Sequence, residues 1–194
     1  MKKSKLINFE TKIKKLYEAG KIRAPIHLSK GNEDQLIKIF KKIKKEDWVF
    51  SNWRSHYHAL LHGIPEKWLE NRIIEGKSMG INSKKYKFYS SSIVGGGLPI
   101  ALGVALGIKL KKSKEKVWVF LGDMTYETGQ FHEVYKYSRN FKLPINFIVE
   151  DNNLSTNTPT DKTWNKKSKI YKDIIHYKYK RIYPHHGTGN WILF

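Results

Sequence analysis

Apolar residues in the first part of the chain recur at the spacing of amphipathic helices. The first such pattern ends at Gly20, the second begins at Asn32, and the third is opened by Pro65 and ended by Gly76. The buried stripe of the first helix consists of Phe9, Ile13, Leu16 and Tyr17. A short apolar run at residues 48–50, between the second and third helices, is typical of a strand.

The pattern changes in the second half of the chain. Residues 77–92 are polar without a clear period and are predicted to form a loop. A strongly apolar helix is expected from about residue 98 to residue 110, and Pro99 suits its first turn.

A strand–helix–strand unit follows that helix. Residues 117–121 and 145–149 are continuous apolar runs, as expected of strands covered on both faces, and an amphipathic helix lies between them. This order makes the two strands parallel neighbours in one sheet, and a last strand is expected near residues 174–179. The fold class is therefore predicted to be α/β, a three-layer α/β/α arrangement with a mainly parallel sheet. Residues 1–194 would form a single domain with an N-terminal helical segment through about residue 45.

The chain is strongly basic, with a formal net charge of +20 from 37 basic and 17 acidic residues. A basic surface can bind nucleic acid, but only five of the 37 are arginines, and base-reading sites depend heavily on arginine. The lysines are also spread along the chain, which favours a solvated surface over nucleic-acid binding.

The cellular compartment is inferred from features of secreted and membrane proteins that the sequence lacks. There is no cysteine, which excludes a disulfide framework and a thiolate nucleophile. No apolar run approaches the ~20 residues that a membrane helix needs. The basic first ten residues lead into an amphipathic pattern and not into the apolar core of a signal peptide. We expect a cytoplasmic protein without a membrane association.

Polar residues follow directly after the two central strands. Gly122-Asp123 ends the first strand, and an acidic and amide cluster at residues 150–153 ends the second. Carboxyl ends of parallel strands share one edge of a sheet, so Asp123 and Asn152 could converge on one point. Carboxylate and amide oxygens are hard ligands that suit Mg²⁺, and free N–H groups at the start of the following helix favour a phosphate.

This spacing resembles the thiamine-diphosphate signature, and the wider context resembles the alpha subunits of 2-oxo acid dehydrogenases. The matching stretches, which span about residues 9–160, are Lys21-Ile22-Arg23, His27-Leu28-Ser29, Asp47-Trp48-Val49-Phe50 with Trp53-Arg54-Ser55-His56, Gly76-Lys77-Ser78-Met79, Ile93-Val94-Gly95, Gly129-Gln130-Phe131-His132-Glu133 and Leu143-Pro144. The resemblance implies a diphosphate- and Mg²⁺-binding domain.

The resemblance also implies roles for individual residues. The implied metal ligands are Asp123, Asn152 and, through its carbonyl, Leu154. The implied cofactor-binding residues are Trp53, Arg54, Val94, Gly122, Asp123, Met124 and Asn152. The candidate catalytic residues are His56, His185 and His186. Met124 replaces the final glycine of the signature, and a backbone conformation that needs glycine would be strained there.

Structural alternatives exist for these residues. Asp123 could cap a helix, Asn152 could form a turn, Arg54 could make a surface ion pair, and His185 and His186 could belong to an exposed polar turn.

The implied function is the alpha-type component of a thiamine-diphosphate-dependent oxidoreductase that decarboxylates a 2-oxo acid and passes on the acyl group. In this family the glutamate that activates the aminopyrimidine lies on a beta subunit, so a beta-type partner in an alpha2beta2 heterotetramer is expected. The alternatives are a split transketolase-like or carboligating transferase subunit, a catalytically silent cofactor-binding subunit, and a basic nucleic-acid binder.

Overall fold

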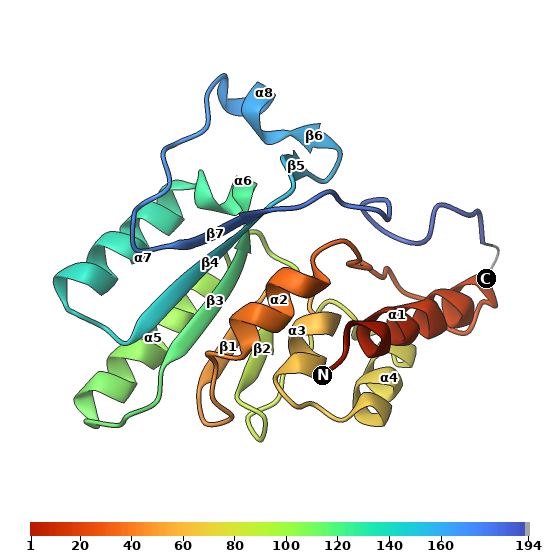
Figure 1. The fold of residues 1–194 in the computed structure, drawn as a ribbon, viewed down its shortest axis with the longest axis horizontal. Helices are drawn as coiled ribbons and strands as arrows, with labels where there is room; N and C mark the ends of the chain where they lie inside the picture. The colour runs from red at the N-terminus through yellow and green to blue at the C-terminus, as the bar shows by residue number, and fades with distance from the viewer. Residues whose placement is uncertain (193–194) are drawn as a thin grey trace.

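A five-stranded parallel sheet forms the centre of the molecule in a computed structural model, which describes residues 1–192 (Figure 1). Its strand order is β2-β1-β3-β4-β7, and each neighbouring pair is parallel. The strands are β1 (Trp48–Ser51), β2 (Phe88–Ser90), β3 (Val117–Gly122), β4 (Ile145–Asp151) and β7 (Ile175–Lys178). The predicted mainly parallel α/β fold and the pairing of the two central strands are confirmed.

Helices cover both faces of this sheet and make three layers (Figure 1). One face packs against α1 (Lys3–Glu18), α2 (Glu33–Phe40), α3 (His56–Leu61) and α4 (Glu66–Ile74). The other packs against α5 (Gly97–Leu110) and α7 (Gly129–Asn140). The helices α1 and α2 fall within the predicted N-terminal helical segment, and the single-domain assignment stays a prediction.

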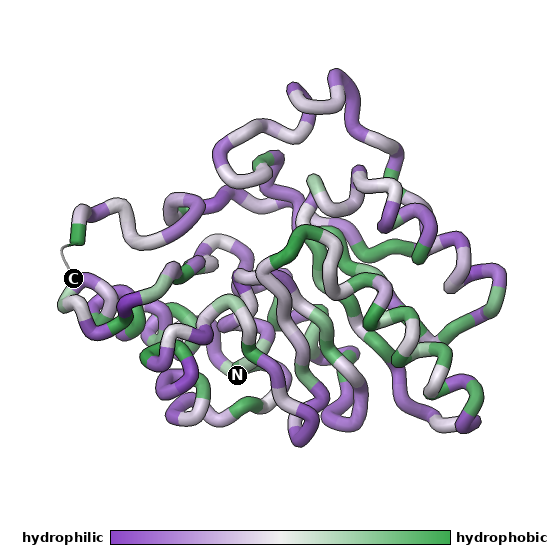
Figure 2. Tube along the Cα trace, turned by 180° about the vertical axis from the view of Figure 1, so that it is seen from behind, coloured by the Kyte–Doolittle hydropathy of each residue, from purple (hydrophilic) through white to green (hydrophobic). Residues whose placement is uncertain are grey.

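Strand β3 shows why its sequence is apolar without alternation. Trp118 and Phe120 belong to the hydrophobic cluster under α1–α4, whereas Val119 and Leu121 belong to the cluster under α5 and α7. Because successive side chains of a strand point to opposite faces, a strand covered on both faces needs apolar residues at every position. Figure 2 shows the resulting concentration of hydrophobic residues in the central strands and in α5.

The prediction of a loop throughout residues 77–92 was wrong at its end. Phe88–Ser90 forms the edge strand β2, which pairs with β1 from Val49 to Ser51. A three-residue strand is too short to show a period of two. Its position is determined by hydrogen bonding to β1, a contact remote in sequence.

Short elements at the carboxyl edge of the sheet also escaped the sequence patterns. The helix α6 (Asp123–Tyr126) follows β3 directly. After β4 the chain makes an excursion beyond the sheet, formed by β5 (Leu154–Ser155), β6 (Thr158–Pro159) and α8 (Thr160–Trp164), before it returns as β7 (Figure 1). Within residues 1–192, no helix is both long enough and apolar enough to span a bilayer.

Candidate functional site

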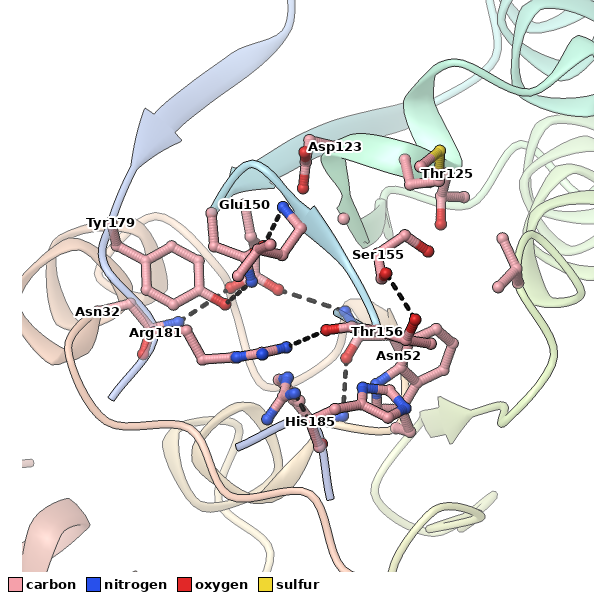
Figure 3. Close-up of a pocket in the computed structure, with 17 residues that line it drawn as sticks. Asn32, Asn52, Asp123, Thr125, Glu150, Ser155, Thr156, Tyr179, Arg181 and His185 are labelled. Carbon is pink, nitrogen blue, oxygen red and sulfur yellow. Dashed lines mark hydrogen bonds between the residues drawn. The ribbon is translucent and has the colours of Figure 1, made fainter. Parts of the chain in front are cut away.

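A pocket opens at the carboxyl edge of the sheet, where the five parallel strands end. The segments that follow β1, β2, β3, β4 and β7 all contribute to its wall (Figure 3). Its lining residues are Asn32, Asn52, Trp53, Arg54, Val94, Gly122, Asp123, Met124, Thr125, Glu150, Asn152, Leu154, Ser155, Thr156, Tyr179, Arg181 and His185. The pocket therefore lies where open parallel sheets bind their ligands.

Most of the residues singled out from the sequence meet in this pocket. Those that line it are Trp53, Arg54, Val94, Gly122, Asp123, Met124, Asn152, Leu154 and His185. The two that do not line it are His56 and His186. The topology thus brings together segments that lie more than 100 residues apart in the sequence.

Asp123 is a buried carboxylate at the start of α6, with a side chain about 6% exposed. Among the described residues, neither of its oxygens has a hydrogen-bond partner. The nearest cation is Lys167, whose Nζ lies 3.4 Å from Oδ2. Burial raises the pKa of Asp123 above its usual range, and the Asp151 carboxylate adds to this effect, whereas the nearby Thr160 hydroxyl and the Lys167 ammonium act in the opposite direction. A buried carboxylate with unused lone pairs fits a cation ligand.

Asn152 and Leu154 lie beside Asp123 because β3 and β4 pair in register, with Gly122 opposite Glu150. The Asn152 amide donates to the Tyr179 hydroxyl over 3.0 Å, and its oxygen accepts from the Leu154 N–H over 2.9 Å. That oxygen retains a second lone pair.

The Leu154 carbonyl belongs to the small β5–β6 hairpin, where Leu154 pairs with Pro159. This pair lies next to the hydrogen-bonded pair of Asn153 and Thr160, so the Leu154 carbonyl makes no hydrogen bond within the hairpin. Asp123, Asn152 and Leu154 each carry an oxygen and all line the pocket. Within residues 1–192 no group of three or more His, Cys, Asp or Glu side chains could hold a metal ion, so amide and carbonyl oxygens are needed for a site here.

Arg54 is held mainly by the protein backbone. Its Nη1 donates to the Leu28 carbonyl over 2.6 Å, and its Nη2 donates to the His185 carbonyl over 2.8 Å. Burial lowers the pKa of this guanidinium from its usual value. The side chain thus ties the N-terminal segment to the C-terminal segment at the edge of the pocket, and the diphosphate contact predicted for it depends on its remaining N–H groups.

Arg181 and Tyr179 were not identified from the sequence as site residues. Arg181 donates to the Thr156 carbonyl over 2.6 Å and to Asn157 Oδ1 over 3.2 Å, and Figure 3 shows its side chain crossing the pocket wall. Both residues follow β7, so the carboxyl-end rule that selected Asp123 could have found them. Burial raises the pKa of Tyr179 to about 12, which keeps its hydroxyl protonated at neutral pH.

A buried polar network underlies the pocket around Glu150. One carboxylate oxygen, Oε1, accepts from the Tyr177 hydroxyl and lies 3.2 Å from His58 Nε2. The other, Oε2, accepts from the Asn52 amide over 3.5 Å. Burial by itself raises the pKa of Glu150, but the neighbouring His58 ring and the Tyr177 hydroxyl hold it below the usual value. Glu150 therefore remains ionised beneath the pocket.

The three candidate catalytic histidines occupy different environments. His56 is fully buried away from the pocket, with Nε2 2.8 Å from Ser78 Oγ and Nδ1 3.3 Å from Glu10 Oε1. His185 lines the pocket and stacks edge-on against His27, with 4.9 Å between ring centroids. His186 packs edge-on against His185. Burial lowers the pKa of His185.

The strain considered for Met124 does not occur. Met124 lies inside α6 and is absent from the residues with positive φ, so its backbone does not need glycine. Its sulfur accepts the indole N–H of Trp164 over 3.1 Å. The side chain therefore connects α6 to α8, the helix of the excursion.

Comparisons with known proteins give one family model and several similar proteins. The family model described as the dehydrogenase E1 component matches residues 1–174. The chain is 32% identical over 161 residues to a chloroplastic pyruvate dehydrogenase E1 component subunit alpha-3 of Arabidopsis thaliana, covering 75% of this chain and 38% of that protein. It is 31% identical over 163 residues to a pyruvate dehydrogenase E1 component subunit alpha of Rickettsia prowazekii, covering 79% of this chain and 50% of that protein. The chain thus spans half or less of the length of these two relatives.

Proposed function

We propose, because the chain belongs to the dehydrogenase E1 component family, that its pocket binds the diphosphate of thiamine diphosphate together with Mg²⁺. The chain would serve as the alpha-type component of an enzyme that decarboxylates a 2-oxo acid and transfers the acyl group. The relatives named pyruvate dehydrogenase E1 alpha subunits support this assignment.

The observation that carries the proposal is the buried Asp123 carboxylate at the pocket wall, which accepts no hydrogen bond within the described chain and lies 3.4 Å from the Lys167 ammonium. An ionised carboxylate without hydrogen bonds is unfavourable in a buried position unless a cation compensates it. Asn152 and Leu154 line the same pocket and supply neutral oxygens. Mg²⁺ is usually held by one or two carboxylates, and water and phosphate oxygens complete its octahedron. One carboxylate from Asp123 with neutral oxygens from Asn152 and Leu154 fits this coordination.

The diphosphate would lie between the cation and the basic side of the pocket. Arg54 and Arg181 both line the pocket and carry N–H groups suited to phosphate oxygens. The backbone N–H of Met124 would donate to the diphosphate, Val94 would contact the aminopyrimidine through its backbone, and Trp53 would pack against the cofactor. When bound, the cofactor supplies the carbanion chemistry, and the protein positions it.

His185 is the histidine best placed to act on a substrate, because it lines the pocket and its pKa is lowered by burial. It would therefore be neutral at pH 7 and able to accept a proton. His56 would act at a distance, by fixing α3 and the segment around Ser78 through its buried contacts.

The proposal includes a partner. The family resemblance assigns the aminopyrimidine-activating glutamate to a beta-type subunit, so we propose that the chain functions in an alpha2beta2 assembly. Both the 2-oxo acid and the acyl acceptor would meet the cofactor at that interface.

Calorimetric titration of thiamine diphosphate into the chain co-expressed with its beta-type partner tests the proposal. We expect binding with Mg²⁺ present, no binding in EDTA, and at least tenfold weaker binding for Asn152→Ala, because one of the metal oxygens is lost. Asn71→Ala is the matched control, since Asn71 is exposed on α4. Absence of Mg²⁺-dependent binding by the wild-type pair would contradict the proposal.

A further inference from the structure

A lysine from the excursion reaches the candidate cation ligand. Lys167 follows α8, and its Nζ lies 2.8 Å from Asp151 Oδ1 and 3.4 Å from Asp123 Oδ2. Two carboxylates at the ends of neighbouring strands thus share one ammonium group. Within the described chain, this ammonium is the only cation in an ion pair with Asp123.

The segment that carries Lys167 is fastened to α6 on both sides of this residue. The Trp164 indole donates to the Met124 sulfur over 3.1 Å. Ser168 donates from its backbone N–H and its hydroxyl to the Glu127 carboxylate, over 2.9 and 2.6 Å. These contacts hold the lysine backbone in place, so the ammonium is presented to Asp123 by a built arrangement and not by a free surface side chain.

Asp123 lies between two pockets. It lines the candidate site together with Asn152 and Leu154, and it also lines a neighbouring pocket together with Asp151 and Lys167. Lys167 does not line the candidate site itself. The ammonium therefore approaches the carboxylate from the neighbouring pocket and does not line the candidate site.

We propose that Lys167 is a tethered counter-cation of Asp123 that sets the affinity of this site for divalent cations. This inference rests on the proposed cation site. Without a metal ion, Lys167 compensates the buried Asp123 carboxylate. When a divalent cation binds Asp123, the two positive charges repel each other, and the lysine moves toward Asp151, which keeps it attached. The protein thereby weakens a site that a bare carboxylate would make tighter.

The size of the effect follows from Coulomb's law. A metal ion ~2.1 Å from Oδ2, the oxygen nearest the ammonium, would lie at most ~5.5 Å from the ammonium in its present position. At that separation, repulsion between a single and a double charge lowers the affinity for the metal ion about tenfold even at the dielectric constant of water. The reduction is larger in a partly buried site. Removing the lysine charge should therefore tighten divalent-cation binding by about tenfold or more.

Mn²⁺ binding to the full chain, followed by electron paramagnetic resonance without cofactor, tests this inference. We expect Lys167→Met to bind Mn²⁺ about tenfold more tightly than the wild type, and Lys167→Arg to bind like the wild type. Lys166→Met is the matched control, because Lys166 is an exposed neighbour without an ion pair in the described part of the chain. Lys167→Gln keeps the comparison available if the methionine variant fails to fold.

The tightening must depend on Asp123. In an Asp123→Asn background, Lys167→Met should leave the Mn²⁺ affinity unchanged within about twofold. Tightening that persists there would show that the ion binds the Asp151 carboxylate, which has lost its Lys167 partner, and would overturn the inference. Mn²⁺ binding by Lys167→Met that is equal to or weaker than that of the wild type also overturns the inference about Lys167. In that case the proposed function still stands if Mn²⁺ binding depends on Asp123. Wild-type affinity in the single Asp123→Asn variant would overturn the cation site itself.

Discussion

Replacing Asp123 by asparagine should make the ligand-free protein more stable than the wild type and the ligand-bound protein less stable than the wild type. The wild-type carboxylate is buried without a hydrogen bond, and its raised pKa shows that folding disfavours its charged form. An unsatisfied buried polar group costs about 1–3 kcal/mol, and more when it is charged. The ion pair with Lys167 offsets up to about 1 kcal/mol of this cost.

Asp123→Asn should therefore stabilise the ligand-free protein by about 1–2 kcal/mol. For a chain of this size, 1 kcal/mol corresponds to about 2–4 °C in the melting temperature, which gives an increase of about 2–8 °C. With Mg²⁺ and thiamine diphosphate at about 100 times their dissociation constant, the wild type gains about 2.7 kcal/mol, whereas the variant gains little. The order of the two melting temperatures should then invert.

Scanning calorimetry in EDTA and in saturating Mg²⁺ with thiamine diphosphate measures both halves of this prediction. Asp34→Asn is the control, since Asp34 is an exposed carboxylate in a surface ion pair with Lys3 and should change stability by less than about 0.5 kcal/mol. A ligand-free Asp123→Asn variant that melts below the wild type would refute the burial argument. Equal stabilisation of both proteins by ligand would refute the role of Asp123 in binding.

The same reasoning fixes the sign of the pH dependence. As pH rises, the unfolded carboxyl ionises near its usual pKa of 3.8, before the folded one, because burial raises the folded pKa. The wild type thus loses stability from pH 3.8 up through the raised pKa. The advantage of Asp123→Asn should be complete above that window and absent below it.

Two further perturbations probe the surroundings of the pocket. Burial lowers the pKa of His27 from 6.5 to about 4, so its ring should titrate near pH 4 by NMR. As the pH falls from 6.5 to 4, this shift should lower the free energy of unfolding of the wild type, and His27→Gln should lack that contribution. A titration midpoint near 6.5 would contradict the prediction. Gly95 has φ +74°, and an added Cβ would overlap Gln130 Oε1, so Gly95→Ala should lower the free energy of unfolding by about 1–3 kcal/mol in denaturant titration. Adding Gln130→Ala should recover only the part due to overlap, and wild-type stability of Gly95→Ala would contradict the prediction.

Much of the fold could be predicted from the sequence because its main signals are local. Continuous apolar runs identified β3 and β4, and the helix between them made their pairing parallel. That pairing then placed Asp123 and Asn152 on the wall of one pocket. Short elements such as β2 and α3 were missed, because three to six residues contain no full period of a pattern.

The directions of side chains in the connecting segments could not be predicted in this way. Arg54 donates to carbonyls that lie 26 and 131 residues away in sequence, so its orientation depends on how distant segments pack. His56 belongs to a matched motif, yet its ring turns into the core toward Ser78 and Glu10. The approach of Lys167 to Asp123 depends on the path of the whole excursion between β4 and β7.

The sequence by itself determined the class of fold, the order of its elements and the edge of the sheet at which polar groups gather. These follow from the periodicity of apolar residues and from the geometry of parallel strands, which depend on neighbouring positions. Only the tertiary structure decided which polar and charged groups meet at that edge, including Arg181 with the Thr156 carbonyl and Lys167 with Asp123. The reason is physical: electrostatic contacts depend on separations of a few ångströms between segments remote in sequence, and no local pattern encodes those separations.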